Sequence, residues 1–206
     1  MRVELQNVAK KYQRDWIFRN VNLELIGGNQ YAIIGPNGSG KSTFIQLIAA
    51  NLLPTRGHIT YNIQGIDIDP ADIYRKISFA APYVELPEEF SLNEFLRFHF
   101  SFKPLLPGFR SDELSEFLQL QGAEDKHIRN FSTGMKQRLK LGVALLSDTP
   151  ILLLDEPATN LDQSGLLWYR ELVVKYSKDR LLLICSNRND EYDFCEQLID
   201  IERYKQ

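Results

Sequence analysis

The sequence predicts an α/β fold built around a parallel sheet, and three stretches of the chain carry this prediction. Residues 30–34 form a short apolar stretch that leads into a glycine-rich loop, and residues 43–50 after the loop are helix-like. Residues 151–154 and 181–185 are continuous apolar runs of strand length. Strands that are apolar throughout are typical of parallel sheets covered on both faces. We therefore expect parallel strands joined by crossover helices.

An antiparallel sheet is expected near the N-terminus, because apolar and polar side chains alternate there. The alternating apolar positions are Val3, Leu5, Val21, Leu23 and Leu25. We expect a single domain over residues 1–206, whose core comprises 1–82 and 141–206. Residues 83–140 are expected to form a mostly helical insertion in this core.

Composition and charge limit the class of function. The 206 residues are 44% hydrophobic and 25% charged, as in a soluble globular domain. The net charge of -3 argues against nucleic acid as the main partner, because such proteins usually carry a basic patch. No apolar run reaches about 18 residues, so the sequence predicts no membrane span. We expect Cys185 and Cys195 to be reduced thiols of a cytosolic protein.

A phosphate-binding loop is predicted between the strand and the helix near residue 40. Its sequence fits the pattern of Gly, four residues, then Gly-Lys-Ser or Gly-Lys-Thr. The glycines let backbone N–H groups turn toward a phosphate, Lys41 adds a positive charge, and Ser42 offers a hydroxyl to Mg²⁺. The residues of this predicted site are Gly35, Pro36, Asn37, Gly38, Ser39, Gly40, Lys41, Ser42 and Thr43.

Two carboxylates follow the apolar run 151–154, at a strand end where α/β proteins place their ligands. Asp155 is placed to hold Mg²⁺, directly or through water. Glu156 is placed to orient or deprotonate an attacking water. A solvated acidic turn would be the simpler interpretation of this pair alone, but the phosphate-binding loop upstream favours the catalytic one.

The segment between these motifs decides the class of ATPase. Residues 130–138 are Asn-Phe-Ser-Thr-Gly-Met-Lys-Gln-Arg and resemble the signature of the ABC ATPases, usually Leu-Ser-Gly-Gly-Gln. Ser132 and Gly134 match that pattern, whereas Thr133 and Met135 depart from it. Ser132 alone would suggest an ordinary helix N-cap, but the order and spacing of the three motifs favour the signature.

The resemblance runs from about residue 2 to about residue 201, and it is to short ATP-binding subunits of the ABC-2 and haem-exporter types. It implies a P-loop ABC core with a helical insertion and an antiparallel β subdomain. It implies ATP and Mg²⁺ as cofactors. It also implies a head-to-tail dimer, in which the signature of one subunit meets the γ-phosphate of ATP on the other. The second ATP-binding subunit could be another copy or a more complete chain.

Two further landmarks of the family fall on identifiable residues. Tyr12 occupies the place of the aromatic residue that stacks on adenine, and Trp16 is a rival for that role. Either ring could instead be an ordinary core or surface residue. Asp162 ends Ala-Thr-Asn-Leu-Asp, which resembles the D-loop whose Asp contacts the partner subunit.

Two residues that the family usually provides are missing, and the first is the switch histidine. It would follow the apolar run 181–185, where Asn187 stands instead. An amide can still donate a hydrogen bond to the γ-phosphate but cannot carry a positive charge. Losing one donor to a developing charge typically costs about 10² to 10³ in rate. We therefore expect Glu156 and Asn187 to be catalytic, ATP to bind normally and hydrolysis to be slow.

The second gap is in the Q-loop, where Pro82 stands in place of the expected Gln. The side chain of Pro has no donor or acceptor, so it cannot contact Mg²⁺ or the attacking water. Water could fill this gap, or Tyr83 or Glu85 could reach into the site.

Phenylalanines concentrated between residues 90 and 109 are candidates for contact with a membrane subunit. In transporters of this family a cytoplasmic helix of the permease docks in this neighbourhood, and an apolar groove suits such a contact. The same rings could pack the core of the insertion, and we favour docking for only two or three of them. The candidates are Phe90, Phe95, Phe98, Phe100, Phe102 and Phe109.

These features predict the ATP-binding, ATP-hydrolysing subunit of an ABC transporter that powers a separate integral-membrane permease. The signature variant favours an exporter. We expect a peripheral protein at the cytoplasmic face of the inner (plasma) membrane, with no nucleic acid as partner. Two alternatives stay open: a soluble ABC ATPase, such as one of iron–sulfur assembly, and a non-hydrolysing subunit that opens and closes with ATP. Co-purification with a membrane protein would distinguish the transporter subunit from the soluble ATPase. Measurable ATP turnover would distinguish it from the non-hydrolysing subunit.

Overall fold

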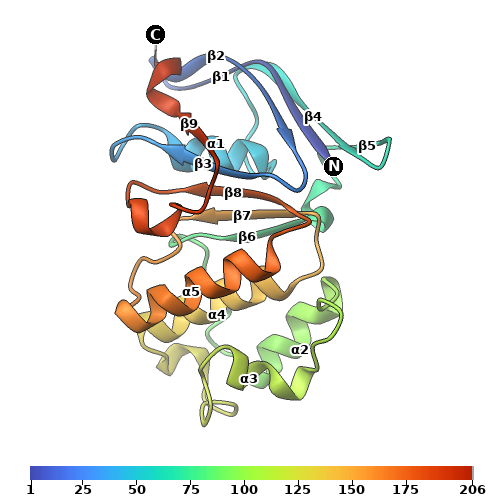
Figure 1. Ribbon diagram of the computed structural model, residues 1–206, viewed down its shortest axis with the longest axis vertical. Coiled ribbons are helices and arrows are strands. Elements are labelled where there is room, and N and C mark those ends of the chain that lie inside the picture. Colours follow the sequence, from blue (N-terminus) through green and yellow to red (C-terminus); the bar gives the residue numbers. More distant parts are fainter. Residues whose placement is uncertain (206) are drawn as a thin grey trace.

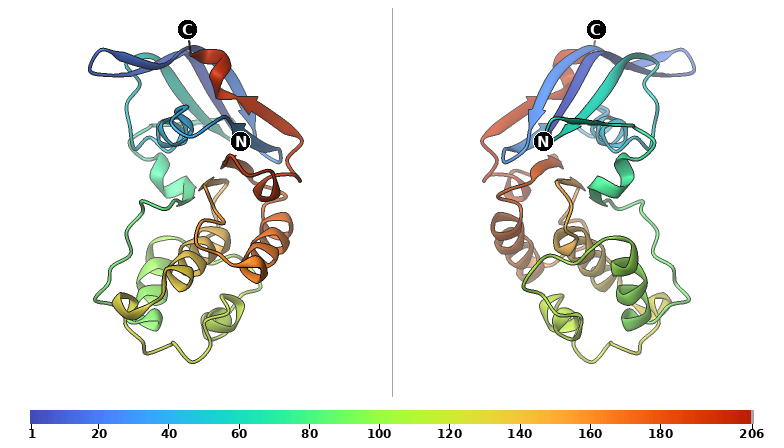
Figure 2. Two further views of the ribbon diagram at one scale, coloured as in Figure 1. Left: turned by 90° about the vertical axis from the view of Figure 1, so that its left-hand side faces the viewer. Right: turned by 90° about the vertical axis from the view of Figure 1, so that its right-hand side faces the viewer.

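The computed structural model describes residues 1–205, which form two sheets and five α-helices (Figure 1). The antiparallel sheet and α1 lie toward one end of the molecule, and α2 to α5 lie toward the other, with the parallel sheet between them (Figure 1). Figure 2 shows the same arrangement from two sides. Among residues 1–205, none of the helices combines the length and the hydrophobicity that a membrane span requires. The predicted α/β fold with an antiparallel β subdomain is confirmed.

The antiparallel sheet has the strand order β2-β1-β4-β5. Val3 pairs with Leu25 and Leu5 pairs with Leu23 across β1 and β2. The alternating apolar positions of the sequence are thus in register, which places them on one face of the sheet. The strands are β1 (Arg2–Tyr12), β2 (Asp15–Ile26), β4 (Arg56–Ile63) and β5 (Ile66–Ile68).

The second sheet is parallel throughout and has the order β6-β7-β8-β3-β9. Its central strands β7 and β8 are buried along their whole length. Leu152 and Leu154 pack on the side of α4 and α5, while Ile151 and Leu153 pack on the side of α1. Both faces are therefore covered, as the apolar runs predicted. The strands are β3 (Gln30–Ile34), β6 (Ile77–Ala80), β7 (Ile151–Asp155), β8 (Leu181–Cys185) and β9 (Gln197–Asp200).

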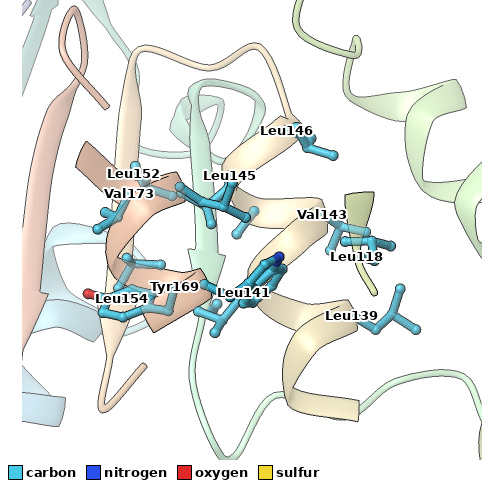
Figure 3. Close-up of a cluster of buried hydrophobic side chains, with 14 of the residues drawn as sticks. Leu118, Leu139, Leu141, Val143, Leu145, Leu146, Leu152, Leu154, Tyr169 and Val173 are labelled. Carbon is cyan, nitrogen blue, oxygen red and sulfur yellow. The ribbon is translucent and has the colours of Figure 1, made fainter. Parts of the chain in front are cut away.

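Helices α4 (Thr133–Leu146) and α5 (Gln163–Tyr176) cover one face of the parallel sheet. In Figure 3, Leu145 of α4 lies beside Leu152 and Val173. Figure 3 also shows Leu139 and Val143 on the other side of α4, close to Leu118. Helix α4 therefore joins the sheet to the helical part of the molecule. Helix α1 (Lys41–Ile48) packs on the opposite face of the sheet.

The helical part contains α2 (Leu92–Phe102) and the short α3 (Leu114–Phe117). Helix α2 begins at a capping box, in which the Ser91 hydroxyl accepts from Glu94 N and the Glu94 carboxylate accepts from Ser91 N. Turns and short 3₁₀ segments connect these helices. Because α4 runs from residue 133 to 146, it crosses the boundary that we expected between 140 and 141.

Candidate functional site

The loop between β3 and α1, residues 35–43 and hereafter the P-loop, borders a pocket of about 260 Å³. Lys41 begins α1, and its side chain is folded back on the loop. Its Nζ donates to the carbonyl oxygens of Gly35 at 2.8 Å and Pro36 at 3.1 Å. The ammonium group is thus held at the loop, where phosphate oxygens could replace these acceptors. The pocket is lined by Ile17, Asn37, Gly38, Ser39, Gly40, Lys41, Ser42, Thr43 and Glu156.

Glycine is required in the P-loop for two separate reasons. Gly38 and Gly40 have φ angles of 76° and 105°, in the left-handed region that other residues rarely adopt. A Cβ atom at Gly40 would also lie 2.5 Å from Cγ2 of Ile17. Inside the loop, Oγ of Ser39 is buried and has no hydrogen-bond partner within residues 1–205. These features fit a backbone cradle for phosphate.

Asp155 ends β7 beside the P-loop and is 1% exposed. Burial raises the pKa of its carboxyl, while the neighbouring Ser42 and Tyr83 side chains lower it. Its Oδ2 accepts a hydrogen bond from the Tyr83 hydroxyl at 3.0 Å. Its Oδ1 is buried and has no hydrogen-bond partner in the described chain. An unpartnered carboxylate oxygen beside a serine hydroxyl is the donor set that Mg²⁺ prefers, so these residues fit that ion.

Glu156 follows Asp155 and has a φ angle of 44°. This left-handed conformation is uncommon for a residue other than glycine, and strained residues of this kind cluster at functional sites. The N–H of Glu156 donates to the carbonyl oxygen of Cys185 at 2.8 Å, which ties the end of β7 to the end of β8. Its half-buried side chain lines the P-loop pocket.

Asn187 lies just beyond β8 and contacts the P-loop. Its exposed side chain donates through Nδ2 to Oδ1 of Asn37 at 3.0 Å. The preceding Ser186 fixes this turn, because its N–H donates to Ile33 O at 3.3 Å and its Oγ accepts from Arg188 N at 2.9 Å. The residue that stands in place of the switch histidine is therefore adjacent to the pocket.

The segment after β6 contains Pro82 at the position where the family usually has a Gln. Two nearby side chains, Tyr83 and Glu85, are the candidates to reach the site in its place. Pro82 is exposed, and its carbonyl oxygen accepts from Lys140 Nζ at 2.9 Å. Tyr83 reaches Asp155 with its hydroxyl. Glu85 is exposed and lines a separate pocket of about 610 Å³. Of the two side chains considered from the sequence, the structure brings Tyr83 to the site.

The signature and D-loop residues lie at the starts of α4 and α5. The Ser132 hydroxyl caps α4 by accepting from Met135 N at 3.2 Å, and the Asp162 carboxylate caps α5 by accepting from Gly165 N at 2.7 Å. Ser132 is exposed and Gly134 is half-buried. Neither they nor Asp162 line the P-loop pocket of their own chain.

The two aromatic candidates for adenine have different surroundings. Tyr12 ends β1 and is 46% exposed, with Lys10 Nζ 5.3 Å from its ring centre. Trp16 is surrounded by cations that lie 5.3 to 5.5 Å from its ring centre. Neither ring lines the P-loop pocket. The cations around Trp16 belong to Lys11, Arg19 and Arg56.

Ile17 lines the pocket although no sequence motif indicates it. Lys10 pairs with Phe18 and Lys11 with Trp16, so Ile17 is the extra residue of a β-bulge. Bulges re-aim side chains, and here Cγ2 of Ile17 lies against the P-loop. The alternation of apolar and polar residues in this strand does not mark the bulge.

Two of the phenylalanines in the helical part are exposed. Phe98 is 49% exposed and Phe102 is 73% exposed, and their ring centres are 5.1 Å apart. Phe95 is buried. The remaining rings are partly buried against the core, so they serve packing as the alternative interpretation proposed: Phe90, Phe100 and Phe109.

The family of the chain follows from a match along most of its length. The sequence profile of the family described as ABC transporter matches residues 18–159. The chain belongs to the ABC transporter family.

Curated relatives of this ABC protein include ATP-binding proteins named for transport or export. It is 29% identical over 190 residues to the lantibiotic transport ATP-binding protein SrtF of Streptococcus pyogenes, covering 90% of this chain and 79% of that one. It is 28% identical over 206 residues to the Nod factor export ATP-binding protein I of Cupriavidus metallidurans, covering 97% and 68%. It also matches ATP-binding cassette sub-family A member 17 of Mus musculus at 27% identity, but spans 12% of that protein's length.

Solved structures agree on the fold. A putative ABC transporter ATP-binding protein from Pyrococcus furiosus has a TM-score of 0.83 over 100% of both chains, at 22% identity. The bacterial ABC transporter cassette MJ0796 is 25% identical over 97% of this chain and 95% of that one. It was solved as a dimer, with a TM-score of 0.82, and in a post-hydrolysis state bound to ADP and Pi, with a TM-score of 0.83.

Proposed function

We propose that this ABC subunit binds Mg-ATP in the P-loop pocket and hydrolyses it slowly. The observation that carries the proposal is the meeting of three features at one sheet edge. They are the P-loop with Lys41, the Oδ1 of Asp155, which has no hydrogen-bond partner among residues 1–205, and Glu156 in the pocket wall. When bound, Mg²⁺ would neutralise charge on the phosphates. Lys41 would exchange its two carbonyl acceptors for phosphate oxygens, and Ser42 would offer its hydroxyl to the ion.

Two side chains would act on the attacking water and the developing charge. Glu156 would orient the water and accept its proton. Asn187 reaches the P-loop as a neutral donor, through its bond to Asn37. Because an amide lacks the charge of a protonated histidine, we expect stabilisation of the transition state to be weaker, by about 10² to 10³ in rate.

The transporter role extends this proposal to the partners. The relatives named for lantibiotic transport and Nod factor export support an ATP-binding subunit of an exporter. The exposed pair Phe98 and Phe102 offers an apolar surface that would suit an amphipathic helix of a membrane permease. On this proposal the subunit is peripheral, at the cytoplasmic face of the membrane, and pairs with a second ATP-binding subunit.

Steady-state ATP hydrolysis at saturating Mg-ATP tests the catalytic proposal. Glu156→Gln should lower the rate by about 10² to 10⁴, because it removes the general base. Asn187→His should raise the rate by about tenfold or more, because it restores a donor that can be charged. ATP affinity, measured on the same preparations, should change little in either variant.

Asn189→His is the matched control, since Asn189 is exposed two residues further along the same turn. If the wild type, Glu156→Gln and Asn187→His all bind ATP but hydrolyse none, the chain is a nucleotide-gated subunit without turnover. Fast turnover that Asn187→His does not raise would contradict slow hydrolysis. A chain that does not bind ATP would contradict the proposed function itself.

A further inference from the structure

Tyr83 makes a contact at the candidate magnesium site that no sequence motif assigns. Its hydroxyl donates to Oδ2 of Asp155 at 3.0 Å. Tyr83 as a whole is 46% exposed, whereas Asp155 is 1% exposed. The ring therefore enters the site from the surface, and its polar tip ends on a buried carboxylate.

The Tyr83 ring is held in this position from several sides. Its centre lies 6.2 Å from that of Phe79 on β6, in a tilted arrangement. The side chain of Gln46 on α1 also lies near the hydroxyl. The hydroxyl acts as the donor in this pair, and the Asp155 carboxylate accepts.

The backbone that carries Tyr83 is anchored to the signature helix. Lys140 on α4 donates through Nζ to the carbonyl oxygens of Pro82 at 2.9 Å and Ala81 at 3.4 Å. Pro82 contributes a fixed φ angle at the same point. The segment therefore has little freedom to withdraw the Tyr83 hydroxyl from Asp155.

The contact divides the two oxygens of Asp155 between different roles. Oδ2 is occupied by Tyr83, and Oδ1 is buried without a partner in the described chain. We propose that Tyr83 is a positioning residue that holds Asp155 so that Oδ1 is free for Mg²⁺, in the gap where Pro82 offers no polar group. The inference rests on the proposed Mg-ATP site. Partners that hydrogen-bond a metal-ligating carboxylate typically contribute about 10- to 100-fold in metal affinity or activity.

The test is the gain in ATP affinity that Mg²⁺ gives, measured as the ratio of the ATP Kd in EDTA to the Kd in excess MgCl₂. Tyr83→Phe keeps the ring and removes the hydroxyl. It should lower this ratio by about tenfold or more, while the Kd in EDTA stays within about twofold. The melting temperature should be close to that of the wild type, which excludes a general loss of structure.

Two further variants make the result specific. Tyr74→Phe removes a hydroxyl from a Tyr that is 55% exposed and accepts from Arg75 Nε at 3.0 Å, so the ratio should not change. Asp155→Asn should lower the ratio by itself, and adding Tyr83→Phe to it should lower the ratio no further, because the two residues act through one interaction.

The outcomes separate the inference from the proposed function. A wild-type ratio well above one that Tyr83→Phe leaves unchanged overturns the role of Tyr83 alone. An additive loss in the double variant also overturns it, because Tyr83 would then act without Asp155. A wild-type chain that binds no ATP in either buffer overturns the proposed function and the inference together.

Discussion

Glu191 is a buried carboxyl group in the turn that carries Asn187. Its side chain is 1% exposed, and Oε2 has no hydrogen-bond partner within residues 1–205. Arg188 Nε lies 3.7 Å from Oε1, too far for a direct hydrogen bond. Burial raises the pKa of Glu191 to about 7; Ser186 and Arg188 oppose the shift, while Asp190 and Glu156 add to it. The carboxyl is therefore half protonated near neutral pH.

This pKa predicts that stability falls as the pH rises. The folded state binds the proton more tightly than the unfolded state, whose value is near 4.5. The stability that the neutral carboxyl contributes is complete below pH 4.5 and is lost as the pH rises through 7. Between pH 5.5 and 8 the loss should be about 2 kcal/mol in the free energy of unfolding. Glu191→Gln should remove this part of the pH dependence.

Urea unfolding at pH 5.5 and pH 8 measures the effect. Glu196→Gln is the matched control, because Glu196 is an exposed carboxylate in the same part of the chain. The free energy of unfolding of Glu196→Gln should depend on pH as that of the wild type does. If Glu191→Gln also keeps the wild-type pH dependence, burial does not hold the proton on Glu191.

At the residue scale, sequence motifs predict the contacts that form within one short segment of the chain. The P-loop contacts of Lys41 belong to this kind, since they lie within one loop. The contact of Tyr83 with Asp155 is different, because it joins the turn after β6 to the end of β7, and the two residues are 72 positions apart. Ile17 depends on a bulge whose effect appears only when β1 and β2 are paired. Such contacts require the tertiary structure and have no local pattern.

At the scale of elements, α4 has one position where even a methyl group does not fit. Gly142 lies in the buried middle of α4. An added Cβ atom would lie 1.7 Å from Cδ2 of Leu118, which is itself fully buried. Figure 3 shows Leu118 against α4, beside Val143 and Leu139. Glycine therefore allows the segment after α3 to approach the helix closely.

Gly142→Ala should destabilise the protein although alanine is the better helix former. The gain in helix propensity is about 1 kcal/mol. Overpacking against Leu118 typically costs about 1 to 3 kcal/mol. Because the added atom would come within 1.7 Å of Leu118, we expect a cost near the upper end of this range. The net loss in the free energy of unfolding, measured by urea titration, should be up to about 2 kcal/mol.

The double variant with Leu118→Ala tests the cause. Leu118→Ala alone should cost about 2 to 5 kcal/mol, but it creates the space that the new methyl group needs. The two losses should therefore sum to more than the loss of the double variant, by about 0.5 kcal/mol or more. Additive losses would show that Gly142 is not limited by Leu118.

Sequence patterns predict well those elements in which apolar residues either form a continuous run or alternate regularly with polar ones. The apolar runs 151–154 and 181–185 became β7 and β8, and the alternating positions near the N-terminus became β1 and β2. The segment between α2 and α4 is harder to predict. Its only α-helix, among the described residues, has four residues, and Pro104, Pro107 and Gly108 interrupt the chain before it. Packing against α4 and α5, rather than local helix propensity, orders this segment.

At the scale of the whole molecule, the signature is displayed where a second subunit could contact it. Ser132 is exposed, and Gly134 lies beside the D-loop, where an added Cβ would be 3.3 Å from Asn160 O. The buried Gln137 joins the two segments by donating to Pro157 O at 2.7 Å. The signature and the D-loop thus form one surface, separate from the P-loop pocket of the same chain. The proposed head-to-tail dimer would place this surface over the pocket of its partner.

A chain that binds ATP without hydrolysing it should reveal this dimer. In Glu156→Gln with Mg-ATP, sedimentation should show a shift from monomer to dimer that ADP does not cause, because the γ-phosphate would bridge the subunits.

Adding Gly134→Asp should keep the chain monomeric, since a carboxylate would face the partner's phosphates and like charges at an interface cost several kcal/mol. Gly65→Asp adds the same charge at a glycine with open space around it and should leave the dimer intact. Because the φ angle of Gly65 is 84°, the melting temperature of this variant is measured first to establish that it is folded. If Gly134→Asp still dimerises with normal ATP affinity, the signature does not face the partner's nucleotide. If Glu156→Gln stays monomeric while ATP is bound, two copies of this chain do not pair, and the second ATP-binding subunit is a different protein.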